Sequence, residues 1–188
     1  MALLSRLALL RLVPSLVTVL LVGGPALASQ SAEAPEYQVK AVFLFNFAQF
    51  VDWPPVARPD SAPLVIGVLG GDPFGRVLDA TVRGEHLGAR PFAVLRFARV
   101  EDIGACDILF ISQSEGSRVE AILAGLGNRA ILTVSDINGF ATRGGMIHFV
   151  TDKHRIRLKI NVDAARAARL TISSKLLRLA EIVSTQGR

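Results

Sequence analysis

Three continuous apolar runs constrain the fold of this 188-residue chain more than any other feature. They span residues 64–69, 107–112 and 130–135. An apolar run without alternation is typical of a strand that is buried on both faces, as at the centre of a parallel sheet. Helices are expected between the runs, from residue 73 to about 82 and from 114 to about 125. Strands that alternate with helices predict an α/β fold, a three-layer sandwich around a mostly parallel sheet.

The C-terminal third predicts an antiparallel hairpin at the edge of that sheet, with arms at residues 147–151 and 155–161. Basic and apolar side chains alternate strictly from Arg155 to Ile160. This alternation is typical of a strand with one face in solvent. The remaining expected elements are a strand at 92–97 and two short closing helices at 163–170 and 174–183.

The N-terminal segment, residues 1–28, has the pattern of a secretory signal peptide, and 19 of its residues are apolar. Arg6 and Arg11 precede a short apolar core, and Ala26-Leu27-Ala28 is an A-x-A cleavage pattern. We expect cleavage between Ala28 and Ser29, which would leave a soluble periplasmic protein if the chain is bacterial. The alternative is an uncleaved anchor, but the core is shorter than the ~20 residues that a transmembrane helix needs.

The mature chain is expected to be a flexible leader, residues 29–35, followed by one domain, residues 36–188. Removal of the first 28 residues leaves 160, enough for one sizeable core. It also leaves 19 basic and 16 acidic side chains, a net charge of +3 that does not indicate a nucleic-acid-binding protein. The single cysteine, Cys106, excludes an internal disulfide and a Cys-rich zinc site. It is expected to be buried, with pairing between two chains as the alternative.

No motif for catalysis or cofactor binding has the required context. Residues 125–130 match the G-x-G-x-x-A pattern, but they follow a helix and precede a strand, whereas the dinucleotide fingerprint follows a strand and opens a helix. The G-x-S-x-G elbow of serine hydrolases is absent. His86, His148 and His154 have no acidic or nucleophilic partner at a recognisable spacing. We therefore predict no catalytic residue, no cofactor and no metal.

Polar residues follow two of the buried strands, and they define a candidate ligand crevice. In open α/β sheets, ligands bind outside the carboxyl ends of the parallel strands. The crevice would be built from Ser112, Ser114, Ser135 and Asp136. The competing interpretation is that these residues only cap the helices that follow the strands.

The first expected helix of the domain, residues 36–51, is unusually rich in phenylalanine. Phe43, Phe47 and Phe50 follow the i, i+4, i+7 spacing of one helix face, which predicts that they pack in the core. Phe45 points elsewhere, and it is the candidate contact for a dimer or a protein partner. Core packing explains the apolar character of this helix at least as well as an interface does.

Several segments, taken together and in order, resemble the YfiR family of periplasmic proteins. They span almost the whole mature chain. The matching segments are 37–41, 45–47 and 53–54 near the N-terminus, 66–68 and 72–74, 106–112, 132–136, 139–141 and 144–147, and finally 160–161 with 173–180.

The resemblance implies a secreted α/β domain that is not an enzyme. In the best-known branch, such a protein binds the periplasmic sensor domain of an inner-membrane diguanylate cyclase, and it lowers cyclic di-GMP synthesis and biofilm formation. Members tend to dimerise, and cysteine oxidation affects their state. With Cys106 alone, this chain cannot form an internal redox switch. The alternative function is a periplasmic sensor that binds a small ligand in the strand-end crevice.

Overall fold

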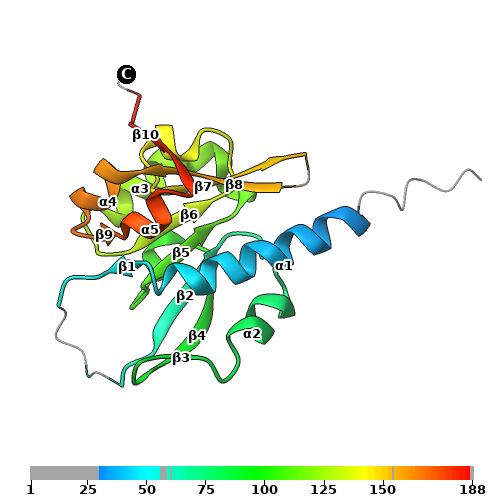
Figure 1. Cartoon of the computed structure of the whole chain (residues 1–188), viewed down its shortest axis with the longest axis vertical. Helices are drawn as coiled ribbons and strands as arrows, with labels where there is room; N and C mark the ends of the chain where they lie inside the picture. Colours follow the sequence, from blue (N-terminus) through cyan, green and yellow to red (C-terminus); the bar gives the residue numbers. More distant parts are fainter. Residues whose placement is uncertain (1–29, 56–58, 60, 154, 187–188) are drawn as a thin grey trace, which may run out of the picture.

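The computed structural model describes residues 30–55, 59, 61–153 and 155–186. The expected signal peptide and its cleavage site at Ala28 and Ser29 lie outside the described residues. At the centre of the fold is an eight-stranded sheet (Figure 1). In spatial order its strands are β10 (Ala180–Val183), β8 (Arg155–Asn161), β7 (Ile147–Asp152), β6 (Leu132–Ser135), β5 (Ile108–Ile111), β2 (Leu64–Leu69), β4 (Arg90–Phe97) and β3 (His86–Leu87).

The predicted α/β fold with a mostly parallel sheet is confirmed. β4, β2, β5, β6 and β7 pair in parallel, and every residue of β2, β5 and β6 is buried. β7 and β8 form the expected antiparallel hairpin. The hairpin is not the edge, however, because β10 pairs in parallel with β8 outside it. A separate two-stranded sheet joins β1 (Val51–Asp52) to β9 (Thr171–Ile172) in antiparallel fashion.

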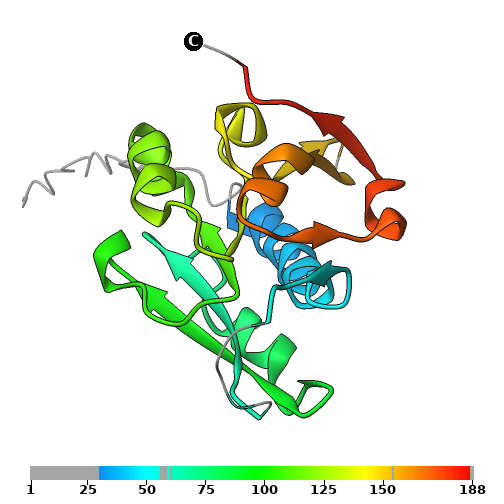
Figure 2. The same cartoon turned by 90° about the vertical axis from the view of Figure 1, so that its left-hand side faces the viewer.

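Helices lie on both faces of the sheet and make the outer layers of the sandwich (Figure 2). One face packs against α1 (Gln30–Phe47), α2 (Arg76–Val82), α4 (Val162–Ala167) and α5 (Ser174–Leu177). The other packs against α3 (Val119–Leu126) and the 3-10 turns η1 (Val100–Asp102) and η3 (Phe140–Arg143). None of the helices among the described residues is long and apolar enough to cross a membrane.

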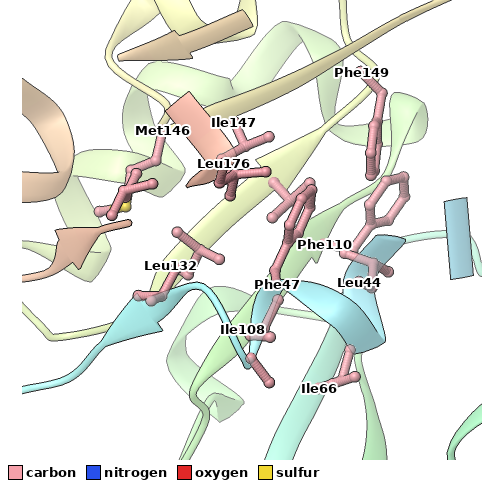
Figure 3. Close-up of a cluster of buried hydrophobic side chains, with 14 of the residues drawn as sticks. Leu44, Phe47, Ile66, Ile108, Phe110, Leu132, Met146, Ile147, Phe149 and Leu176 are labelled. Atoms are coloured by element: carbon pink, nitrogen blue, oxygen red, sulfur yellow. The ribbon is translucent and has the colours of Figure 1, made fainter. Parts of the chain in front are cut away.

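The phenylalanines of α1 fill the larger core. Phe47 is 1% exposed, and its ring stacks on Phe149 at a centroid distance of 5.8 Å (Figure 3). Phe43 in α1 and Phe50, in the turn that follows α1, are half-buried against the same core. Phe45 is also half-buried, with its ring centroid 5.0 Å from that of Phe92. The sequence-based assignment to the core is confirmed for Phe47. Phe43 and Phe50 are only half-buried, as Phe45 is, and Phe50 lies beyond the end of α1, so the three do not share one helix face.

Several helix boundaries differ from the sequence-based prediction. α1 ends at Phe47 rather than at 51, α3 begins at Val119 rather than at 114, and α4 ends at Ala167 rather than at 170. α1 begins at Gln30, inside the stretch 29–35 that was expected to be a leader, and it includes Pro35. α2 begins at Arg76 rather than near Pro73. In front of α2, the Asp72 carboxylate accepts the backbone N–H groups of Phe74 and Gly75, at 2.8 and 3.2 Å. Asp72 therefore closes a turn that precedes the helix instead of capping its first residue.

The predicted closing helix at 174–183 is wrong in its second half. α5 ends at Leu177, and the chain then forms strand β10. The i, i+3, i+6 spacing of Lys175, Arg178 and Glu181 favoured a continuous helix. The β-branched pair Ile182-Val183 favours a strand, and parallel pairing with β8 gives the backbone its hydrogen bonds. Tertiary pairing outweighs a local helical pattern here.

Candidate functional site

The carboxyl ends of β2 and β5 mark the topological switch point of the sheet. From β2 the chain crosses to β4, whereas from β5 it continues in the opposite direction to β6. A ligand crevice is expected at such a point. Here Ser114, from the segment after β5, contacts the turn after β2, and its Oγ accepts the N–H of Gly71 at 2.9 Å. The neighbouring Gly70 has a φ of 86°, and a Cβ there would lie 2.5 Å from the Ser114 Oγ.

The other two serines of the predicted crevice are buried. Ser135 Oγ donates to the carbonyl of Ile111 at 2.6 Å and accepts the N–H of Ile137 at 3.0 Å. Ser112 precedes the 3-10 turn η2 (Gln113–Arg118), and its side chain makes no capping hydrogen bond there. The Ser135 bonds fasten the end of β6 to β5. A role for these serines in ligand binding stays a prediction.

Asp136, the fourth residue of the predicted set, lies in a charge cluster with side chains from α1. Its Oδ2 accepts hydrogen bonds from Lys40 Nζ at 2.6 Å and from the Tyr37 hydroxyl at 2.9 Å. Lys40 is 1% exposed, and its Nζ also lies 2.6 Å from Glu36 Oε1. The ammonium group sits 4.4 Å from the centroid of the Tyr37 ring. The buried lysine is therefore surrounded by two carboxylates and an aromatic face.

The cluster joins α1 to two separate strand ends. Glu36 Oε1 accepts a hydrogen bond from Thr151 Oγ1 in β7 at 2.8 Å, and Asp136 follows β6 directly. Burial opposes the charged form of Glu36, but hydrogen bonds from Lys40 and Thr151 lower the pKa of Glu36 below its ordinary value. Burial lowers the pKa of the nearby His148. The site thus carries two carboxylates, one ammonium group and an imidazole whose neutral form is favoured.

A cleft of about 220 Å³ opens beside this cluster. Asp136 Oδ1 is buried and has no hydrogen-bond partner in the part of the chain that the structure describes. A buried acceptor without a partner is unfavourable, and it would be satisfied by an N–H or O–H donor. Among the described residues, no group of three or more His, Cys, Asp or Glu is placed to hold a metal. The lining residues are Glu36, Lys40, Gln113, Asp136, Asn138, His148, Phe149, Val150 and Thr151.

Sequence reasoning found Asp136 but missed Glu36, Tyr37 and Lys40. The sequence did contain one indication of this cluster. Lys40 stands in a helix that is apolar nearly all round, and Glu36 lies four residues before it, at the spacing of an ion pair on a helix. A lysine in such a position is almost never fully buried unless it is paired. Its partner Asp136 lies 96 residues further along the chain, so only the fold shows the pair.

Cys106 lies two residues before the start of β5 and is 5% exposed. Its thiol donates to the carbonyl of Ile108, with Sγ 3.1 Å from the oxygen. A buried thiol must first be uncovered before it can pair with a second chain. Pairing between chains therefore requires local opening near the start of β5.

Comparison with known proteins places the chain in a family. A search of curated proteins gave no match. A family model described as YfiR/HmsC-like matches residues 37–181. The match begins at Tyr37 in α1, at the buried charge cluster, and ends at Glu181 in β10. It therefore includes the whole sheet except the last residues of its edge strand, and the chain belongs to the YfiR/HmsC-like family.

Proposed function

We propose that this protein is a periplasmic, non-catalytic regulator that binds the periplasmic sensor domain of an inner-membrane diguanylate cyclase and lowers cyclic di-GMP signalling. The observation that carries this proposal is the family match over residues 37–181, because YfiR-type proteins are periplasmic regulators of diguanylate cyclases. Residues 1–28 supply the expected export signal. The protein acts by binding, either alone or as a homodimer.

A few apolar side chains are exposed at the surface of the described residues. Large apolar side chains are exposed on separate elements, among them Val39 and Val42 on α1 and Leu95 on β4. Phe45 lies on the same helix and is the candidate partner contact. These side chains lie on separate elements, and apolar side chains that are exposed singly are common on protein surfaces, so the proposal does not depend on them. At the strand ends, Ser114 and Ser135 are engaged in hydrogen bonds within the fold.

The test is direct binding. Tagged protein comprising residues 29–188 is incubated with detergent-solubilised inner membranes, and the captured proteins are identified by mass spectrometry. The sensor domain of a captured cyclase is then purified and titrated with the same protein by calorimetry. We expect saturable binding, and Phe45→Ala weakens it if Phe45 is in the interface. The absence of any diguanylate cyclase from the captured proteins, together with no heat of binding, would contradict the proposal.

A second candidate function is supported by the unpartnered Asp136 Oδ1 beside the cleft. We propose as the alternative that the cleft binds a small molecule that carries an N–H or O–H donor, and that the protein reports its presence to a sensor. The test is thermal unfolding in the presence of single small amines and polyols. A ligand that raises the Tm of the wild type but not of Asp136→Asn supports this function. An equal shift in both proteins argues against it.

A further inference from the structure

A second groove, of about 660 Å³, lies between the β7–β8 hairpin and the turn that leads from α5 into β10. It is lined by residues of the hairpin on one side and by residues of the turn and of β10 on the other. β8 contributes Arg155 through Lys159, and the turn contributes Arg178 and Leu179. Leu179 is 75% exposed, which is unusual for a leucine beside strands. The groove is therefore an open, partly apolar surface next to a strand edge.

The edge of β8 in this groove is only partly covered. β10 pairs with β8 from Leu158 to Asn161, so on that side Arg155, Ile156 and Arg157 have no strand partner among the described residues. Figure 1 shows the β7–β8 hairpin extending past the end of β10. Unpaired backbone groups at a sheet edge accept an added strand from another chain. The uncovered length of three residues suits a short segment rather than a whole sheet.

The charged side chains of the groove indicate which kind of peptide segment it would bind. Four basic side chains line it against two carboxylates, those of Asp152 and Glu181. These carboxylates are used locally, since Arg157 pairs with Asp152 at 3.3 Å and Lys159 with Glu181 at 3.1 Å. The two remaining cations, Arg155 and Arg178, have no carboxylate partner among the described residues. They lie on opposite sides of the groove, one in β8 and one after α5.

We propose that this groove binds an extended, acidic segment of the regulated protein, which adds to the free edge of β8 as a short strand. The segment is held by backbone hydrogen bonds to those N–H and C=O groups of Arg155–Arg157 that point away from β7. Its carboxylates pair with Arg155 and Arg178, and an apolar side chain covers Leu179. The proposal rests on the proposed function only for the identity of the partner. A neutral or basic segment lacks the charge complementarity that steers and orients binding.

The experiment uses the ¹⁵N-labelled mature chain, residues 29–188. The probe is an acetylated heptapeptide that alternates Glu and Val, and the control peptide has Lys in place of each Glu. We expect the acidic peptide to shift the backbone amide resonances of Arg155–Arg157 and Leu179, with weaker binding at higher salt. The double variant Arg155→Glu and Arg178→Glu should weaken binding on the order of tenfold, because two attractive contacts become repulsive.

A matched control carries Arg76→Glu and Arg83→Glu, an equal change of charge at two exposed residues of α2 and its C-terminus. This control should leave peptide affinity unchanged. Equal binding of the Lys peptide, or shifts confined to other elements, would overturn the proposal. It would also be overturned if the chain sediments as a dimer that the Arg155 and Arg178 variant dissociates, because the occupant would then be a second copy.

The same two double variants separate this proposal from the proposed function. If a cyclase sensor domain binds the wild type and both variants equally, the groove proposal fails and the regulatory function stands. If the acidic peptide binds in the groove but no cyclase sensor domain binds the protein, the groove proposal stands and the regulatory function fails.

Discussion

Replacing the buried Lys40 should destabilise the fold strongly. Lys40→Met keeps the length of the side chain and removes the charge, which leaves Asp136 as a buried carboxylate without its ammonium partner. The side chains of the two residues are 2% and 4% exposed, so water cannot replace the lost contact without local opening. Breaking one partner of a buried ion pair costs about 3–5 kcal/mol. This is a large part of the ~5–15 kcal/mol that holds a typical domain folded.

The assay is urea unfolding of the mature chain at neutral pH, followed by circular dichroism, with the free energy of unfolding extrapolated to water. Lys159→Met is the matched control, since it removes a lysine from a more exposed pair with Glu181, at 3.1 Å and side-chain exposures of 36% and 61%. Its loss should be at most about 1 kcal/mol.

The double variant Lys40→Met and Asp136→Leu removes the two buried charges and leaves Glu36, whose side chain is 29% exposed and can be hydrated. It should recover much of the stability that the single variant loses. It also keeps the prediction testable if Lys40→Met does not fold. A loss below about 1 kcal/mol in Lys40→Met, or a double variant less stable than the single, would refute the reasoning that a desolvated charge pair holds α1 to the strand ends.

Four further predictions follow from individual residues. Phe47→Ala should lower the free energy of unfolding by about 3–5 kcal/mol, whereas Phe45→Ala should lower it much less, as measured by urea unfolding. Burial lowers the pKa of His148 below its ordinary value of 6.5, so the unfolded chain takes up a proton before the folded one does. The free energy of unfolding should therefore fall as the pH drops below about 6.5, and His148→Gln should weaken this pH dependence. Cys106→Ser should cost only about 1 kcal/mol, because the carbonyl that accepts the thiol can accept a hydroxyl. Mass spectrometry of the exported protein should find Ser29 at its N-terminus; the full-length chain in the membrane fraction would contradict this.

The sheet could be predicted because its central strands are locally unambiguous. β2, β5 and β6 are short, continuous apolar runs between turn residues, and such runs are typical of strands that are buried on both faces of a parallel sheet. In β8, the strict alternation of basic and apolar residues predicts a strand with one face in solvent. β10 could not be found in the same way, because Ala180-Glu181-Ile182-Val183 carries both helical and strand patterns. Pairing with β8 decides between them, and that contact is not local.

The candidate site was only partly predictable for the same reason. The sequence places serines and Asp136 at strand ends, but it does not show which of them are already satisfied. Ser114 and Ser135 use their hydroxyls within the fold, and Asp136 instead meets Lys40 from a helix far away in the chain. A buried lysine can be suspected from its apolar surroundings, but its partner depends on how α1 crosses the sheet.

The most direct test of the proposed regulatory function is the cellular level of cyclic di-GMP, measured by mass spectrometry in cells that lack this protein. The deletion should raise cyclic di-GMP, and expression of the full chain should restore the original level. A chain that lacks residues 1–28 should fail to restore it, because it would not reach the periplasm. An unchanged cyclic di-GMP level after deletion, or full restoration by the chain without residues 1–28, would contradict regulation from the periplasmic side of the membrane.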